Sequence, residues 1–91
     1  MKYTRVKWKH DQPDAPALIY SELDADQWEQ RKIEVFSDGR MNYADKTREA
    51  GDTMLSLEPL PELEKIAMDP QFEVSEISKE DFEVLWTGAT K

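Results

Sequence analysis

His10 is the single histidine of the chain, and Asp11 follows it directly. An imidazole beside a carboxylate supplies the parts of a general base and its orienting group. With Asp14, the three side chains could also hold a metal ion. A metal or hydrolytic site needs further ligands or a nucleophile at defined spacing, however, and none is evident. The alternative is turn chemistry, in which Asp11 and Asp14 cap loop amides beside Pro13 and Pro16.

A second candidate is an acidic stretch around Trp28. An exposed aromatic ring among carboxylates suits the docking of a cationic partner. The alternative is an ordinary solvated turn with Trp28 in the core, because runs of charge usually face water. The acidic residues of this stretch are Glu22, Asp24, Asp26 and Glu29.

A third candidate lies on the strand predicted over residues 28–36. Counted by two, Glu29 and Arg31 share a face with the apolar Ile33. Buried charges must be paired, and Glu22 on the neighbouring strand is the candidate partner of Arg31. The arrangement is open between a solvated sheet end, a structural ion pair and a binding site. A bulge near Lys32 would flip the faces and remove this argument.

Several classes of site are excluded by what the sequence lacks. The chain has three glycines and no cysteine, so disulfides and cysteine-based zinc sites are excluded. We find no glycine-rich phosphate loop, G-x-S-x-G, H-E-x-x-H or EF-hand spacing. We therefore expect no cofactor, no metal and no enzymatic activity.

Alternating hydrophobicity predicts the strands that carry these side chains. In the first strand Thr4, Val6 and Trp8 share a face, and we expect the opposite, basic face to be solvated. Asp38-Gly39 predicts a tight hairpin turn. The strands are expected at Lys2–Lys9, Ala17–Leu23, Trp28–Phe36 and Met41–Ala44, followed by a loop over Asp45–Thr53.

Two short helices are predicted in the second half of the chain. Pro59 and Pro61 frame the first, which ends at Asp69-Pro70. Ser78 is the expected N-cap of the second, and Gly88 its expected end. A hydrophobic staple between residues 77 and 82 and an acidic, solvated outer face complete this helix. We predict an α+β fold, with an antiparallel meander of about four strands and both helices packed on one face. The other face is expected to be wet.

Length and charge place the chain among small soluble domains. It has 91 residues, a net charge of −8 and nine aromatic residues, three each of Trp, Tyr and Phe. One domain over residues 1–91 is expected, and the aromatic residues argue against disorder. Residues 1–10 carry four basic side chains, but the negative total disfavours nucleic acid and attracts a basic protein partner. No signal peptide or membrane span is evident, so we expect a cytoplasmic monomer or weak homodimer.

Several stretches carry a resemblance to a known family. They are V-K-W-x-H-D-x-P-D-x-P, L-I-Y-S-E-L-D, W-E-x-R-K-I-E-V-F and F-E-V-S-E-I-S-K-E-D-F-E-V-L-W. The chain resembles a family of uncharacterised bacterial proteins of similar length, described as a domain of unknown function (DUF6881-like). The resemblance implies a single domain and no catalytic residue.

The function we predict is a small acidic, non-catalytic protein-binding domain. A toxin-immunity or inhibitor protein that docks a basic partner is its concrete form, by association with other small acidic domains. The alternatives are a phage-type inhibitor that mimics nucleic acid, a small enzyme using His10 and Asp11, and a structural or regulatory accessory domain. The basic first strand argues against the mimic.

Overall fold

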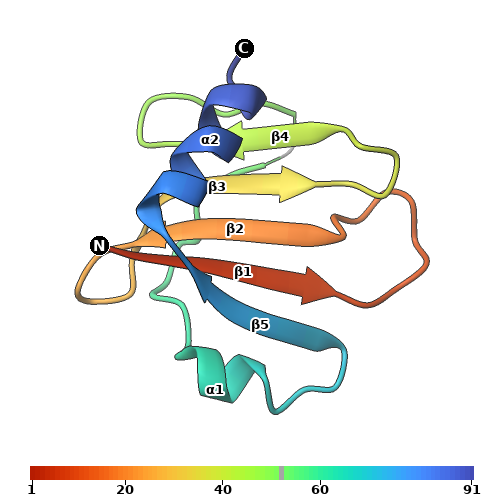
Figure 1. Cartoon of the computed structure of the whole chain (residues 1–91), viewed down its shortest axis with the longest axis vertical. Helices are drawn as coiled ribbons and strands as arrows, with labels where there is room; N and C mark the ends of the chain where they lie inside the picture. The colour runs from red at the N-terminus through yellow and green to blue at the C-terminus, as the bar shows by residue number, and fades with distance from the viewer. Residues whose placement is uncertain (52) are drawn as a thin grey trace.

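The computed structural model describes residues 1–51 and 53–91 (Figure 1). Five antiparallel strands form one sheet in the order β4-β3-β2-β1-β5, with α2 in front of it. None of the helices in the described part of the chain has the length and apolar character needed to cross a bilayer. The elements are β1 (Lys2–Trp8), β2 (Leu18–Leu23), β3 (Glu29–Val35), β4 (Met41–Ala44), α1 (Leu63–Ile66), β5 (Phe72–Ile77) and α2 (Lys79–Ala89).

The first four strands form the predicted meander. The β3–β4 turn closes at Gly39, whose φ of +91° is a conformation that glycine adopts without strain. Its amide donates to the carbonyl of Phe36 at 2.9 Å. The prediction for β1 was wrong on one point, because Tyr3 on the basic face is buried in the core.

The fifth strand was missed from the sequence. β5 pairs with β1 from Trp8↔Phe72 to Tyr3↔Ile77. Its sequence alternates apolar Phe72 and Val74 with polar Glu73 and Ser75, a pattern that is typical of a strand. The sheet therefore has five strands rather than about four.

Helix α2 begins as predicted and ends later than predicted. The Ser78 Oγ accepts a hydrogen bond from the Asp81 amide at 3.1 Å, which confirms the N-cap. Phe82 is fully buried and packs with Tyr3, Tyr20 and Ile33 of the sheet. The helix continues through Gly88 to Ala89, where the Thr90 hydroxyl donates to the Trp86 carbonyl at 2.8 Å.

The two helices do not pack on the same face. Ile66 of α1 lines a hollow with Val6 and Ile19, which point away from α2. Residues 53–60, the connecting segment, run across this same face, where the Leu60 amide donates to the Gln27 carbonyl at 2.8 Å. The face expected to be wet is therefore largely covered, since the connecting segment returns across it.

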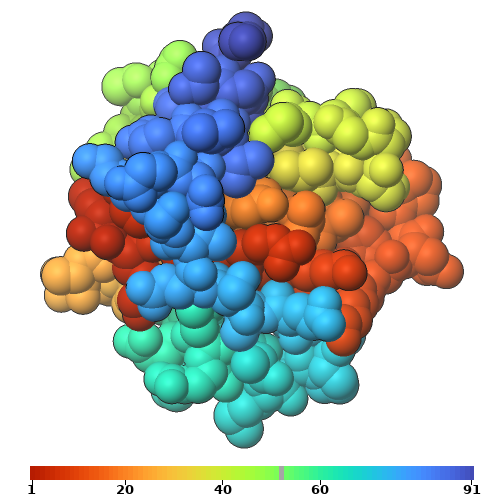
Figure 2. Space-filling model, viewed as in Figure 1, coloured from red at the N-terminus to blue at the C-terminus, as the bar shows by residue number. Residues whose placement is uncertain are grey.

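The front face is covered only in part. α2 lies over the ends of the strands near the N-terminus (Figure 1). In the space-filling view, β2 (orange) remains visible between α2 (blue) and β1 (red) (Figure 2). A hollow lined by Tyr20 of β2 and Leu85 of α2 lies at this place beside the helix.

Candidate functional site

A bulge separates the two charges that the strand pattern placed together. Glu22 pairs with Arg31 and the next residue, Leu23, pairs with Glu29, so Gln30 is an extra residue on β3. An extra residue inverts the alternation of faces. Arg31 therefore faces α2, whereas Glu29 faces the connecting segment. The prediction that they share a face was wrong.

Arg31 is held by carboxylates from two elements. It binds Glu22 of β2 through Nε at 2.9 Å and Nη2 at 2.7 Å, as predicted. It also binds Glu83 of α2 through Nη1 at 2.8 Å and Nη2 at 2.9 Å. Its guanidinium lies 4.9 Å from the Phe82 ring centroid and 5.1 Å from that of Trp86. Glu83 was expected on a solvated helix face, because sequence spacing does not show which strand a helix crosses.

The electrostatics of this cluster favour a structural ion network. Hydrogen bonds from the Arg31 guanidinium hold the pKa of Glu22 and that of Glu83 below the usual range of glutamate. Burial, with Glu22 nearby, raises the pKa of Tyr3. The bonds to Glu22 join β3 to β2, and the bonds to Glu83 join the sheet to α2. Glu22 and Arg31 are therefore engaged with one another and with Glu83 inside the fold.

Glu29 anchors the connecting segment to the sheet. Its side chain is 1% exposed. It accepts hydrogen bonds from the Ser21 hydroxyl at 2.8 Å and the Ser56 amide at 2.6 Å. The Lys32 ammonium lies 3.2 Å from it. Each partner satisfies a buried acceptor, as a buried charge requires.

The acidic turn between β2 and β3 presents its aromatic ring to solvent. The Asp24 Oδ1 accepts from the amides of Asp26 at 2.9 Å and Trp28 at 3.0 Å, so this carboxylate shapes the turn. Gln27 adopts a φ of +70°, uncommon for a residue other than glycine. Trp28 is 42% exposed, which excludes the core position considered for it. Asp26, two residues before it, is also exposed.

Further apolar side chains are exposed at this end of the molecule. Leu57 is 83% exposed, and it belongs to the connecting segment that is hydrogen-bonded to the turn. Met1 is 73% exposed and precedes Lys2, which lies opposite Leu23 at the start of the turn. We call the exposed side chains of Met1, Asp26, Trp28, Leu57 and Glu58 the turn surface. Single exposed apolar residues are ordinary on a protein surface, whereas contiguous apolar patches are typical of interaction sites.

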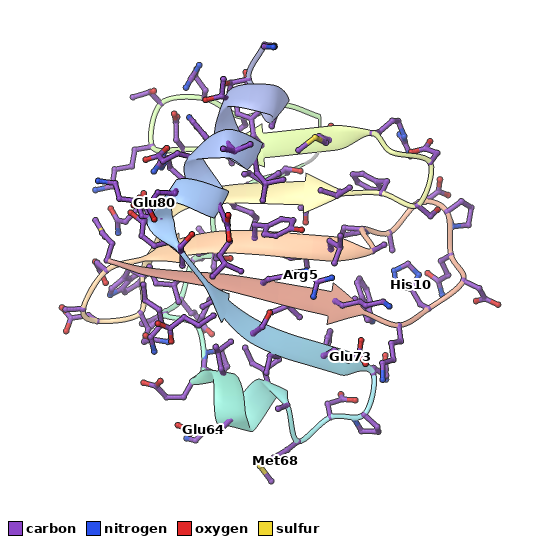
Figure 3. All side chains as sticks on the ribbon, viewed as in Figure 1. Arg5, His10, Glu64, Met68, Glu73 and Glu80 are labelled. Carbon is purple, nitrogen blue, oxygen red and sulfur yellow. The ribbon has the colours of Figure 1, made fainter. Side chains whose placement is uncertain are left out.

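His10 lies in the β1–β2 loop, at the opposite end of the strands (Figure 3). Its Nε2 lies 2.8 Å from the Pro16 carbonyl, and its Nδ1 accepts from the Gln12 amide at 3.0 Å. Its ring also packs edge-on against Trp8, with centroids 4.5 Å apart. The prediction that Asp11 and Asp14 cap amides of this loop was wrong, because the His10 imidazole accepts the amide hydrogen bond.

Asp11 and Asp14, which were expected to cap loop amides, are exposed and make no hydrogen bond within the described residues. Neither they nor His10 lies near Glu22 or Glu29. Within residues 1–51 and 53–91, no three His, Cys, Asp or Glu side chains are grouped so that they could hold a metal ion. The eight predicted site residues are thus divided among the ion network, the Glu29 anchor, the β2–β3 turn and the His10 loop.

Comparison with known proteins identifies a family and nothing more specific. The family described as "Domain of unknown function (DUF6881)" matches residues 2–91, nearly the whole chain. No curated protein and no solved structure matches the chain.

Proposed function

The chain belongs to the DUF6881 family, a domain of unknown function, and we propose that it is a non-catalytic binding protein that docks a basic protein partner. The observation that carries the proposal is the exposure of Trp28 at an acidic turn. Trp is among the residues that contribute most to binding when a partner buries them. The turn surface is the docking site of this proposal.

The charge of the turn surface supports a basic partner. Asp26 and Glu58 have no basic side chain within ion-pair distance among the described residues, so their charges remain available. Asp24 adds a further negative charge while it shapes the turn. A net charge of −8 extends the same sign over the molecule and accelerates encounter with a cation-rich surface.

The rigidity of the turn surface supports docking without rearrangement. Gln27 is bound to the connecting segment through its backbone carbonyl at 2.8 Å and its side-chain amide at 3.4 Å. Glu29 binds the Ser56 amide in the same region. Preorganised surfaces lose less entropy on binding. A toxin-immunity or inhibitor protein, which covers the basic surface of its target, is the form of this function that we favour.

The proposal is tested by capture from the native host on the immobilised chain, followed by measurement of affinity for the captured protein. We expect a basic protein whose affinity falls with salt, because exposed charges are screened. Trp28→Ala should weaken binding by about tenfold or more, the usual effect of losing an interface tryptophan. Leu57→Ser should also weaken binding to the captured protein.

Met68→Ser is the matched control, since Met68 is 81% exposed but lies beyond α1, outside the turn surface. The Met68→Ser variant should bind the captured protein with the affinity of the native chain. An acidic target, an affinity indifferent to salt, or equal effects of Leu57→Ser and Met68→Ser would refute the proposal. Tight binding to bare polynucleotide would refute it as well.

A further inference from the structure

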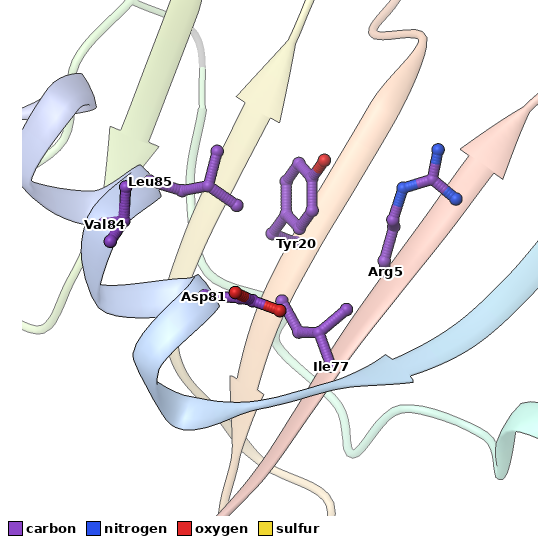
Figure 4. A pocket seen from close by; sticks show the side chains of 6 residues that line it. All are labelled: Arg5, Tyr20, Ile77, Asp81, Val84 and Leu85. Carbon is purple, nitrogen blue, oxygen red and sulfur yellow. The ribbon is translucent and has the colours of Figure 1, made fainter.

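A hollow of about 360 Å³ lies beside α2 on the front of the sheet. Figure 4 shows the side chains around it. This volume is at the small end of the range for ligand sites, about 300–1,000 Å³. Its lining residues are Arg5, Tyr20, Ile77, Asp81, Val84 and Leu85.

Arg5 differs from the other arginines of the chain. Arg31, Arg40 and Arg48 each bind a carboxylate and each lie over an aromatic ring. Within the described residues Arg5 does neither, although it is half-buried in the middle of β1. Lys7, on the same face of this strand, is paired with Glu73 at 3.8 Å. The hollow therefore contains a guanidinium that forms no ion pair with any described residue.

Asp81 supplies the opposite charge on the other side of the hollow. It belongs to the first turn of α2, where the helix dipole stabilises a negative charge. Its carboxylate has no basic partner within the described residues, and it does not reach Arg5 to form an ion pair. In Figure 4 the guanidinium and the carboxylate lie on either side of Tyr20.

The wall between these charges is apolar. Ile77 and Leu85 contribute half-buried aliphatic side chains. Val84 is 73% exposed at the rim, where it contributes nothing to the core. The ring of Tyr20 forms the floor, and no hydrogen bond engages its hydroxyl within the part of the chain that is described. The hollow thus combines one cation, one anion, one hydroxyl and an aliphatic surface.

We propose that this hollow binds a free aliphatic α-amino acid. The ligand's carboxylate binds the Arg5 guanidinium and the Tyr20 hydroxyl, and its ammonium binds Asp81. Its side chain lies against Val84 and Leu85. A zwitterion fits because it satisfies two separated, opposite charges at once. The inference is independent of the proposed function, since the turn surface shares no residue with the hollow.

The first experiment titrates the native chain with L-leucine while amide and side-chain NMR signals are recorded. We expect saturable shifts at Arg5, Tyr20 and Leu85 and none at Trp28. Two analogues test the two charged groups of L-leucine separately. 4-Methylpentanoate lacks the ammonium group, and isoamylamine lacks the carboxylate. Each should bind about tenfold or more weakly than L-leucine, because a charge in the hollow is then unpaired.

The second experiment uses variants with matched controls. Arg5→Met and Asp81→Asn should each weaken L-leucine binding by about tenfold or more. Lys7→Met, on the same face of β1, and Glu80→Gln, beside Asp81, should bind L-leucine as the native chain does. Absence of saturable binding to the native chain overturns the proposal. So does equal binding of either analogue, or equal weakening by the control variants.

Discussion

Arg31 of β3 binds both carboxylate oxygens of Glu22 on β2, at 2.9 and 2.7 Å. The same guanidinium binds Glu83 of α2, so one side chain joins two strands to the helix that covers them. Its exposed fraction is 19%, and that of the Glu22 side chain is 10%. Removal of one partner from this pair should therefore cost more stability than removal of one partner from a surface ion pair.

We predict that Arg31→Met destabilises the fold by about 3 kcal/mol, because it leaves the Glu22 carboxylate buried without its cation. Urea unfolding followed by tryptophan fluorescence measures the change. Arg40→Met is the control, since the Arg40–Asp38 pair is 58% exposed on both sides. It should cost less than about 1 kcal/mol. Equal losses in the two variants would contradict the structural role of Arg31.

The acid dependence of stability follows from the same cluster. The pKa of Glu22 and that of Glu83 are lowered from 4.5 by Arg31. A carboxyl with a lowered pKa contributes stability that is complete above the unfolded-state pKa and is lost as pH falls through the folded-state pKa. The native chain should therefore lose stability as pH falls below about 4.5, the unfolded-state value.

In Arg31→Met this acid-induced loss should be smaller. Urea midpoints measured at a series of pH values for both chains give the comparison. Parallel curves would show that the lowered pKa values have another cause.

Glu29 should control the attachment of the connecting segment. Glu29→Ala leaves the Ser56 amide and the Ser21 hydroxyl without their acceptor, so we expect a loss of about 2–3 kcal/mol. Hydrogen exchange at the Ser56 amide should accelerate more than that of β2 amides. Glu58→Gln, an exposed change in the same segment, should alter stability by less than about 0.5 kcal/mol. Unchanged exchange at Ser56 in Glu29→Ala would be inconsistent with this anchor.

The tautomer of His10 is fixed by its loop. Because Nδ1 accepts from the Gln12 amide, the proton of the neutral ring belongs on Nε2, facing the Pro16 carbonyl. Nitrogen-15 NMR of the imidazole should report Nε2–H at neutral pH. His10→Ala should cost about 1 kcal/mol, and Asp14→Asn should cost almost nothing. An Nδ1–H tautomer would mean that the loop is held differently.

Local patterns predicted the parts of the structure that depend on neighbouring residues. The cap at Ser78 and the turn at Gly39 were correct, because each arises from a few consecutive positions. The Glu22–Arg31 pair was also predicted, since alternation placed both on facing strands. Gly88 was wrong as a helix end, because a hydroxyl from Thr90 satisfies the last turn.

Contacts between distant segments could not be predicted from these local patterns. Nothing near Gln30 signals a bulge, and yet that one residue moves Glu29 to the opposite face from Arg31. The exposure of Trp28 likewise depends on how the connecting segment returns to the turn. Glu83 meets Arg31 only because α2 crosses the sheet at that strand.

The sequence by itself determined an acidic α+β domain, its meander, the cap of α2 and the identity of the charged residues. Those features follow from alternation, turn residues and composition, which are local. Only the tertiary structure decided which charged side chains are paired inside the fold and which remain at the surface. The physical reason is that burial and pairing depend on contacts between distant segments. Glu22, Glu29 and Arg31 are satisfied inside the fold, whereas Asp26 and Trp28 stay exposed and Arg5 forms no ion pair within the described residues.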